Sequence, residues 1–421
     1  MASFSFGAGN AGKLLRVPLY IAGRLATLVI PRTRDLWVFG SAAGLSDGGW
    51  ALYRHAAQRG ERAVWLTGGD REAADARAHG IPAADKHSLR GFWLTARAAV
   101  TVVTHGFGDV NRYAATGGVI VQLWHGIPLK RIGVDAAVTT ASPVRFGGAL
   151  VGRALAVLYR GTQGRIRVLP AASELVRGRL ESAFGLTSAR VPVTGEPRVD
   201  VLSQGTAERR REAAVRELGE LLGDRHGDLR DAPRVLYAPT WRDGAADPAA
   251  PDAAEIALLR ALLDETGAVL LIRSHPLGGG DYAAALGARV RLLTSDLVTD
   301  VTPLLPGMDV LITDYSSLAF DAALVPLPTV FFAPDLDAYA RSRGFYGTYR
   351  DVAGDDVPTT WGQVAGRVRA LLDDPAAHAA GVDAARALSA RVHAFDDGLN
   401  TDRVYRAIRR CQPVPRHEGT S

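Results

Sequence analysis

The stretch VLITDYSS at residues 310–317 decides the fold that we expect for this chain. Its first four residues are apolar or β-branched and suit a buried strand, and the helix-like stretch 318–323 follows the two serines. A strand, a hydroxyl-rich turn and a helix form an anion-binding geometry, because the first N–H groups of a helix have no internal partner. The serine hydroxyls add donors that suit a pyrophosphate, although a serine pair at such a junction is also typical of an ordinary N-cap.

Short apolar runs alternate with helix-length segments from Asp35 onward, which is the pattern of parallel sheets covered on both faces. Two series of such runs in 421 residues predict an α/β fold with two Rossmann-like domains. The predicted strands of the first series are 36–40, 63–67, 99–104, 119–123, 166–169 and 191–194. Those of the second series are 235–238, 269–272, 290–293, 310–313 and 329–332.

A charge-rich, helix-like segment at 204–230 separates the two series, so we expect the domain boundary there. The predicted first domain is 35–205 and the second is 230–384. We expect terminal helices at 385–411, with a break at Asp397-Gly398, and a disordered tail at 412–421.

Composition narrows the class of protein. The single cysteine, Cys411, excludes an internal disulfide framework and a multi-cysteine zinc site, and it fits a reducing compartment. The net charge of +5 is modest, and basic residues do not alternate with aromatic residues as on a nucleic-acid stacking surface, so we expect no nucleic-acid partner.

Two stretches, 1–34 and 136–173, contain no acidic residue and mix arginines with aliphatic residues. The apolar part of the first is interrupted by Arg16, Pro18 and Arg24, so it is too broken to span a bilayer, and we expect no cleaved signal peptide. Arg145, Arg153 and Arg160 recur on one helical face of the second, as in an interfacial helix. Both stretches therefore suit peripheral attachment to an anionic membrane surface, the alternative being ordinary surface helices with basic faces.

Five further motifs accompany the TDYSS turn. They are QLWHGIPLKRIG at 122–133, GEPRVD at 195–200, LYAPTWRD at 236–243, RSHP at 273–276 and RGFY at 343–346. Together the motifs resemble those of the CDP-glycerol glycerophosphotransferase family, the teichoic acid primases and polymerases, across residues 35–410. The resemblance implies a GT-B-like fold in which two Rossmann-like domains face a central cleft. It also implies CDP-glycerol as donor and a prenyl-diphosphate-linked acceptor, at the cytoplasmic side of the cell membrane.

Two histidines are the candidate catalytic residues. His125 follows the strand 119–123, so it lies at the carboxyl edge of the first sheet, where ligands of open α/β folds bind. An imidazole there suits a general base that removes the proton of an acceptor hydroxyl. His275 follows the strand 269–272 and would offset negative charge on the leaving CMP, the alternative being a core histidine satisfied by the backbone.

The candidate donor-binding residues gather in the second half of the chain. Guanidinium groups bind phosphate oxygens in pairs, which favours Arg242 as a clamp. Asp314 suits a cap of the turn or a contact with the glycerol hydroxyls, because a carboxylate beside a pyrophosphate is repelled by it. The complete predicted donor set is Arg242, Arg273, Thr313, Asp314, Ser316 and Ser317.

The acceptor or accessory candidates are Lys130, Arg131, Arg198, Arg343 and Tyr346. The sequence leaves open whether Arg198 reaches a substrate or pairs with Asp200. His105 follows the strand 99–104 and has either a structural role or a contact with the acceptor. No metal-ligand spacing is present, so we predict no protein-held metal or cofactor, although a divalent cation bridging the pyrophosphate is compatible with this.

Two alternatives to the predicted activity stay open at this level. One keeps the fold and replaces the donor by CDP-ribitol or by a nucleotide sugar for a capsule or wall polymer. The other is an inactive membrane scaffold, which the retained histidines, Arg242 and serine pair disfavour. The sequence does not separate primase from polymerase and does not fix the oligomeric state.

Overall fold

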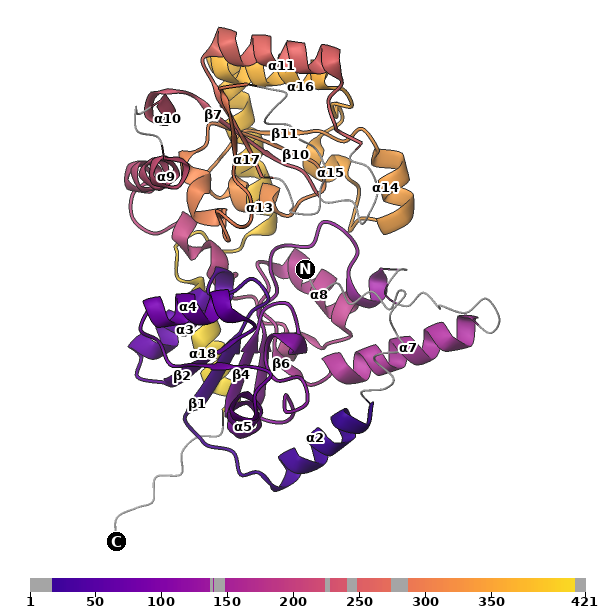
Figure 1. Ribbon diagram of the computed structural model, residues 1–421. Coiled ribbons are helices and arrows are strands. Elements are labelled where there is room, and N and C mark those ends of the chain that lie inside the picture. Colours follow the sequence, from indigo (N-terminus) through magenta and orange to yellow (C-terminus); the bar gives the residue numbers. More distant parts are fainter. Residues whose placement is uncertain are drawn as a thin grey trace. The chain divides into compact units, whose positions relative to one another are not determined.

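The computed structural model describes residues 17–136, 139, 148–223, 228–240, 248–273 and 287–412, and it divides into two units (Figure 1). The first unit contains the chain up to His125, then Ile132–Arg198 and the stretch from Leu399. The second unit contains Gly126–Arg131 and Val199–Gly398. The division at Arg198 lies a few residues before the predicted boundary, and the segment Gly126–Arg131 leaves the unit that surrounds it in the sequence.

In the part of the chain that is described, the sheet of the first unit has the strand order β3-β2-β1-β4-β5-β6, and its paired strands are parallel. Strands β1 and β5 are buried along their whole length, as expected for a sheet covered on both faces. The strands are β1 (Leu36–Gly40), β2 (Arg62–Thr67), β3 (Ala83–Asp85), β4 (Val100–Val103), β5 (Val119–Gln122) and β6 (Ile166–Val168).

Two strand assignments in this unit differ from the prediction. Residues 191–194 do not form a strand, and only Val193 makes an isolated bridge, to Ala171. The reason is Pro192, which has no N–H group to continue a ladder. The short edge strand β3 was not predicted, because its sequence AAD carries no hydrophobic pattern and its pairing with β2 alone defines it.

Helices cover the sheet of the first unit. They are α2 (Val17–Val29), α3 (Asp47–Gln58), α4 (Asp70–Ala78), α5 (Leu89–Arg97), α7 (Gly148–Gln163), α8 (Glu174–Phe184) and α18 (Asn400–Cys411). Their ends follow local chemistry: Ser173 caps α8 by accepting a hydrogen bond from the N–H of Val176, and Gly185 ends it in the left-handed region. The chain also forms the short 3₁₀ helices η1 (Phe107–Asp109), η2 (Gly133–Asp135), η3 (Ser188–Arg190), η4 (Pro197–Leu202) and η5 (Thr302–Gly307).

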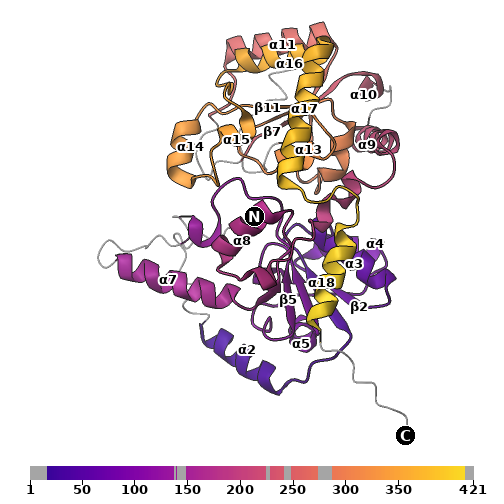
Figure 2. The same ribbon diagram turned by 180° about the vertical axis from the view of Figure 1, so that it is seen from behind.

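The last helix, α18, returns to the first unit and packs against α3 (Figure 2). Asp402 accepts a hydrogen bond from Arg59 at 2.8 Å and lies 3.4 Å from His55 of α3. At the start of α18, a Cβ atom on Gly195 would overlap the side-chain amide of Asn400. The glycine of the GEPRVD motif therefore has a structural use, since it leaves room for the end of the chain.

The second unit repeats the architecture with the strand order β11-β10-β7-β8-β9, again parallel among the described residues. All the predicted strands of this half form. They are β7 (Arg234–Ala238), β8 (Val269–Ile272), β9 (Val290–Leu292), β10 (Val310–Thr313) and β11 (Thr329–Phe331). The helices are α9 (Ala207–Leu222), α10 (Asp228–Asp231), α11 (Ala253–Thr266), α13 (Leu318–Ala323), α14 (Leu336–Arg343), α15 (Arg350–Ala353), α16 (Trp361–Asp373) and α17 (Pro375–Val392).

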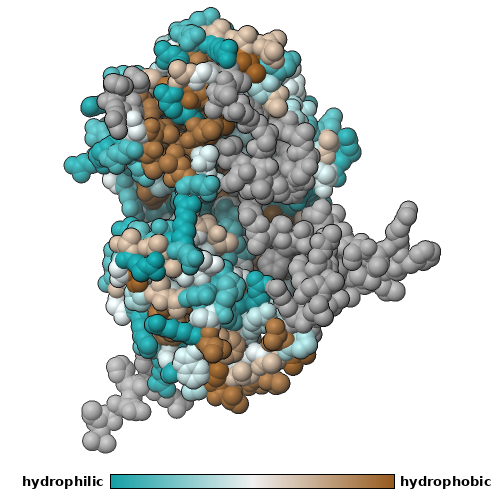
Figure 3. Space-filling view, in the orientation of Figure 1, coloured by the Kyte–Doolittle hydropathy of each residue, from teal (hydrophilic) through white to brown (hydrophobic). Residues whose placement is uncertain are grey.

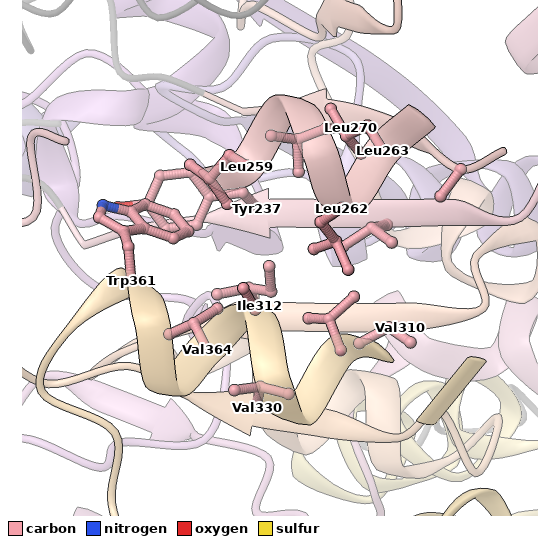
Figure 4. Close-up of a cluster of buried hydrophobic side chains, with 14 of the residues drawn as sticks. Tyr237, Leu259, Leu262, Leu263, Leu270, Val310, Ile312, Val330, Trp361 and Val364 are labelled. Atoms are coloured by element: carbon pink, nitrogen blue, oxygen red, sulfur yellow. The ribbon is translucent and has the colours of Figure 1, made fainter. Parts of the chain in front are cut away.

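One face of this second sheet packs under α11 and α16 (Figure 4). Tyr237 and Ile312 of the strands meet Leu259 of α11 and Trp361 of α16 in one buried cluster. The indole N–H of Trp361 donates to the carbonyl oxygen of Ala249 at 2.7 Å, so the one polar atom of this large side chain is satisfied. The cluster fixes β7 and β10, the two strands that lead into the APTW and TDYSS motifs.

The charged segment that was expected to link the domains is an integral part of the second unit. Helix α9 lies against η5, and Arg211 pairs with Asp309 at 2.6 Å. Asp309 also accepts a hydrogen bond from the N–H of Arg234 at 2.8 Å, just where β7 begins. The charged residues of α9 therefore do more than face solvent, since Arg211 holds the helix against the rest of the second unit.

Candidate active site

His125 lies three residues beyond the end of β5, after a backbone turn. Trp124 has a φ of +65°, a conformation that non-glycine residues rarely adopt, and it turns the chain sharply before the histidine. The His125 ring is 4.2 Å from the ring of Trp124 and 4.7 Å from that of His105, measured between centroids. Trp124 in turn packs edge-on against Phe184 of α8 at 5.2 Å. Flanking rings therefore set the position of the His125 imidazole.

The loop that carries His105 is held by one buried carboxylate. Asp109 accepts hydrogen bonds from the N–H groups of Thr104, His105 and Gly106, at 2.9, 2.6 and 3.1 Å. Burial raises the pKa of Asp109 and lowers the pKa of His105, while the attraction between the two groups opposes both shifts. Asp109 was not predicted, and its one local signal is an acidic residue a few positions after a histidine at a strand end.

Arg198 of the GEPRVD motif lies at the same edge of the first sheet. Its Nε donates to a carboxylate oxygen of Asp47 at 2.8 Å, and both side chains are largely buried. Asp47 is the first residue of α3, after β1, and has a φ of +60°. Because β1, β4 and β5 are neighbours in the sheet, Asp47, His105 and His125 follow adjacent strands. The pairing with Asp47 was not predicted.

The segment after His125 pairs with the RGFY motif inside the second unit. Lys130 forms an antiparallel bridge with Phe345, and the N–H of Tyr346 donates to the carbonyl oxygen of Leu129 at 3.0 Å. The main-chain N–H of Arg131 donates to Gly344 at 3.1 Å, and its Nε to Phe345 at 3.3 Å. The accessory candidates Lys130, Arg131 and Tyr346 are thus brought together, next to Arg343, the last residue of α14.

In the TDYSS turn, two of the predicted donor-binding side chains hold the backbone. The Thr313 hydroxyl donates to the carbonyl oxygen of Ala238 at 2.7 Å. Asp314 accepts from the N–H groups of Thr240 and Tyr315, at 2.7 and 2.6 Å. Asp314 therefore links the turn to Thr240, in the segment that follows β7. These two hydrogen bonds are the contacts expected of a residue that caps the turn.

The two serines lie at the start of α13, and both are partly exposed. The Ser316 hydroxyl accepts a hydrogen bond from the N–H of Leu318 at 3.2 Å, a local turn contact, whereas the N-cap residue Ser317 makes no side-chain capping bond. A serine hydroxyl that accepts one bond retains its own proton as a donor, so this turn contact is compatible with a phosphate contact.

An aromatic cluster of Tyr315, Tyr339, Phe345 and Tyr349 lies behind the turn. Tyr315 stacks on Tyr339 with 3.9 Å between ring centroids and contacts Phe345 of the RGFY motif at 5.6 Å. The Tyr349 hydroxyl donates to the carbonyl oxygen of Asp314 at 2.9 Å. The segments 126–131, 236–240, 313–317 and 343–346 are therefore linked within the second unit, and Tyr349 is a contributor that the sequence did not indicate.

We expect Tyr315→Phe to lower the free energy of unfolding by about 1–3 kcal/mol, because the hydroxyl donates to the carboxylate of Asp335 at 2.9 Å. Burial, and then this hydrogen bond, raise the pKa of Tyr315 above its ordinary value of 10.0. The difference from wild type should therefore be fully present below pH 10 and decline as the pH rises further. Urea unfolding at several pH values measures it. Tyr20→Phe, at a tyrosine that is 41% exposed, is the control and should change little.

The structure places Arg273 against main-chain oxygens. Its guanidinium donates to the carbonyl oxygens of Val298 and Thr299, at 2.8 and 3.2 Å, and burial lowers its pKa. The side chain thus braces the segment before η5, and a contact with phosphate stays a prediction. His275 and Arg242 lie outside the described residues, as do residues 274–276 and 241–243 of their motifs. Across the described ranges, the histidine, cysteine and acidic side chains form no group that suits a metal ion.

The family model for CDP-glycerol:poly(glycerophosphate) glycerophosphotransferase matches residues 25–410. The chain belongs to this family. The predicted family, and with it the prediction of a transferase of this kind, is confirmed.

Curated relatives carry related names. A teichoic acid glycerol-phosphate transferase of Staphylococcus aureus is 29% identical over 286 residues, which cover 65% of this chain and 67% of that protein. A teichoic acid poly(glycerol phosphate) polymerase of Staphylococcus epidermidis is 31% identical over 235 residues, 55% of this chain and 31% of that protein. A teichoic acid poly(ribitol-phosphate) polymerase of Bacillus spizizenii is 34% identical over 189 residues, 42% of this chain and 28% of that protein. The chain thus spans under a third of either polymerase.

Solved structures confirm the fold class. A variant of the wall teichoic acid polymerase TagF superposes with a TM-score of 0.73 at 21% identity, covering 96% of this chain and 97% of that chain. A TagF variant soaked with CDPG gives a TM-score of 0.71 at 22% identity, with the same coverage. The predicted α/β fold of two Rossmann-like units, GT-B-like in class, is therefore correct. No helix in the ranges described here is both long and apolar enough to cross a bilayer.

Proposed function

We propose that this protein transfers glycerol phosphate from CDP-glycerol to a hydroxyl group of a prenyl-diphosphate-linked acceptor and releases CMP, in the synthesis of a teichoic-acid-like envelope polymer. Family membership supports the donor and the reaction class. The observation that carries the proposal is the linkage of the family motifs: the chain leaves His125, pairs with RGFY, and through Phe345 contacts the TDYSS turn. Motifs far apart in the sequence are thus tied into one framework.

In the proposed reaction His125 is the general base. It takes the proton of the acceptor hydroxyl as the oxygen attacks the phosphorus next to glycerol, and the bond from that phosphorus to the bridging oxygen of CMP breaks. Little covalent work falls to the protein in phosphoryl transfer, so the remaining residues position the substrates and balance charge. Ser316, Ser317, Arg242 and His275 are the proposed ligands of the donor phosphates.

The test is incubation of purified protein with CDP-glycerol and a detergent-solubilised lipid-linked acceptor, followed by identification of the released nucleotide. Acceptor-dependent CMP supports the proposal. Turnover of CDP-ribitol but not of CDP-glycerol would support the proposed reaction class and show that the donor is CDP-ribitol. Release of a nucleoside diphosphate from a nucleotide sugar would mean attack at carbon and would overturn the reaction class.

The proposed location is the cytoplasmic side of the membrane, through peripheral contact with an anionic surface. In α2, Leu25, Leu28 and Val29 are 59%, 75% and 81% exposed, and Figure 3 shows hydrophobic surface where Figure 1 places this helix. The opposite side of α2 is anchored, since the Thr27 hydroxyl lies 2.7 Å from that of Thr116. Apolar side chains on the free face of an anchored helix suit insertion between lipid headgroups.

The basic residues of the two acid-free stretches divide into structural and exposed ones. Arg32 donates to the carbonyl oxygens of Ala98 and Thr116, so it anchors the chain after α2. Arg24, and Arg153 and Arg160 of α7, are exposed and available to anionic lipid. Arg145, predicted on the same helical face, lies outside the described residues.

We expect Leu28→Asp to weaken binding to vesicles of phosphatidylglycerol and phosphatidylcholine by about tenfold, the loss of one buried leucine. Vesicle flotation measures the bound fraction. Leu258→Asp, at a leucine of α11 that is 40% exposed, is the control and should bind as wild type does. Equal binding of all three proteins would contradict the role of α2.

A further inference from the structure

We propose that His105 is a positioning residue for His125: its flat, uncharged ring stacks on the His125 imidazole and holds it in the orientation in which it accepts a proton. This inference rests on the proposed function, in which His125 is the general base. It assigns a role to a residue whose sequence context favoured a structural role over an acceptor contact.

The geometry is that of a stacked pair. The ring centroids of His105 and His125 are 4.7 Å apart, and the planes are inclined by 15°. Trp124 contacts the same imidazole at 4.2 Å with an inclination of 33°. Stacking of this kind orients one aromatic ring against another through their faces, without a hydrogen bond between the two rings.

The backbone places His105 firmly. Its N–H group donates to Asp109 at 2.6 Å, and the same carboxylate oxygen also binds the N–H groups of Thr104 and Gly106. The carbonyl oxygen of Thr104 accepts a hydrogen bond from the side chain of Gln122, at the end of β5, at 2.8 Å. Asp109 thus fixes the loop after β4, and Gln122 ties the start of that loop to the end of β5.

The His105 ring is suited to staying neutral. Its Nδ1 is buried, and within the described residues it has no hydrogen-bond partner. A protonated ring would bury an N–H donor without an acceptor, which costs about 1–3 kcal/mol. The carboxylates of Asp109 and Asp47 attract a proton to this ring, but burial outweighs them and lowers its pKa.

Neutrality of His105 has a consequence for the base. An imidazolium forms at position 125 during the reaction, and a second imidazolium at stacking distance would repel it. A neutral aromatic ring instead presents its electron-rich face to the cation. The stacked pair therefore carries a single positive charge, and the proton taken from the acceptor resides on His125.

The kinetic test compares His105→Leu, which fills similar space without a flat ring, with His105→Phe, which keeps a neutral flat ring. We expect the leucine variant to lower kcat by about 10- to 100-fold through misorientation of the base, with little change in the KM for CDP-glycerol. The phenylalanine variant should keep kcat within about threefold of wild type, because stacking survives. His87→Leu, at an exposed histidine of the same unit, should be unchanged.

A second readout needs no turnover. With isotope-labelled histidine, the ring resonance of His125 is assigned by its loss in His125→Ala. We expect the phenylalanine variant to keep the His125 resonance close to its wild-type position and the leucine variant to shift it, because only the contribution of the neighbouring ring of Trp124 remains. If none of the nucleotide donors reacts, the proposed function is rejected. The His125 resonance still shows whether His105 stacks on His125, because this measurement does not depend on turnover.

Three outcomes would overturn the positioning role. They are wild-type kcat in a folded leucine variant, loss of kcat in a folded phenylalanine variant, or an unchanged His125 resonance in the leucine variant. If the leucine variant does not fold, the phenylalanine variant alone tests the positioning role. It must then keep both its kcat and the wild-type position of the His125 resonance.

Discussion

The His125→Ala variant is expected to release CMP about 10³-fold more slowly than wild type, because a positioned general base contributes about 10²- to 10⁴-fold to proton transfer. The KM for CDP-glycerol should change little, since none of the proposed donor ligands is removed. The effect should appear in kcat under acceptor saturation. Steady-state CMP release with a detergent-solubilised acceptor measures both constants.

The control for this variant is His87→Ala, which removes an exposed histidine from the same unit. It should retain full activity. Folding of the His125 variant is checked by its urea midpoint, which should shift only slightly because its ring is partly exposed. Full activity in a folded His125→Ala protein would reject the proposed base and leave the donor assignment untouched.

Asp314→Ala is the second change for which we expect a large effect, and here the effect is on the donor turn. The carboxylate accepts the N–H groups of Thr240 and Tyr315, and Asp314 is 5% exposed. Its removal leaves two shielded donors without their partner, at a cost of about 1–3 kcal/mol each. We therefore expect a local loss of about 2–6 kcal/mol.

The loss should be visible as faster amide hydrogen exchange in peptides that contain residues 236–240 and 313–317, with the first unit unchanged. The KM for CDP-glycerol should rise at least about tenfold, since the serines would no longer be held in place. Asp337→Ala, at an exposed aspartate of α14, is the matched control. Wild-type exchange rates in both motifs would show that the carboxylate does not organise the turn.

Much of the donor turn was readable in the sequence because its signals are local. The run 310–313 is apolar and β-branched, and it forms β10 over the residues predicted. The serines after it begin α13, as a strand–turn–helix pattern requires. Local signals do not show a distant partner: the Thr313 hydroxyl donates to Ala238, 75 residues away, which the sequence did not indicate, and a contact of Thr313 with phosphate stays a prediction.

The surroundings of His125 in the first unit likewise contain features that the sequence predicted and features that it did not. The position of His125 after a buried strand was predictable, because β5 begins with three β-branched apolar residues and the carboxyl edge follows from a parallel sheet. The neighbours that orient it were not. Asp47 and Arg198 are 151 residues apart, and the stacking of His105 on His125 depends on the adjacency of β4 and β5.

By itself, the sequence determined the α/β class, the paired series of strands, and the motifs that identify the family, since hydrophobic periodicity and turn chemistry act over a few residues. Only the tertiary structure decided that Gly126–Arg131 belongs to the second unit, that α18 returns to the first, and that Arg273 braces a loop. These outcomes depend on hydrogen bonds and packing between residues far apart in the chain. Such contacts leave no local pattern, because either partner alone would suit many environments.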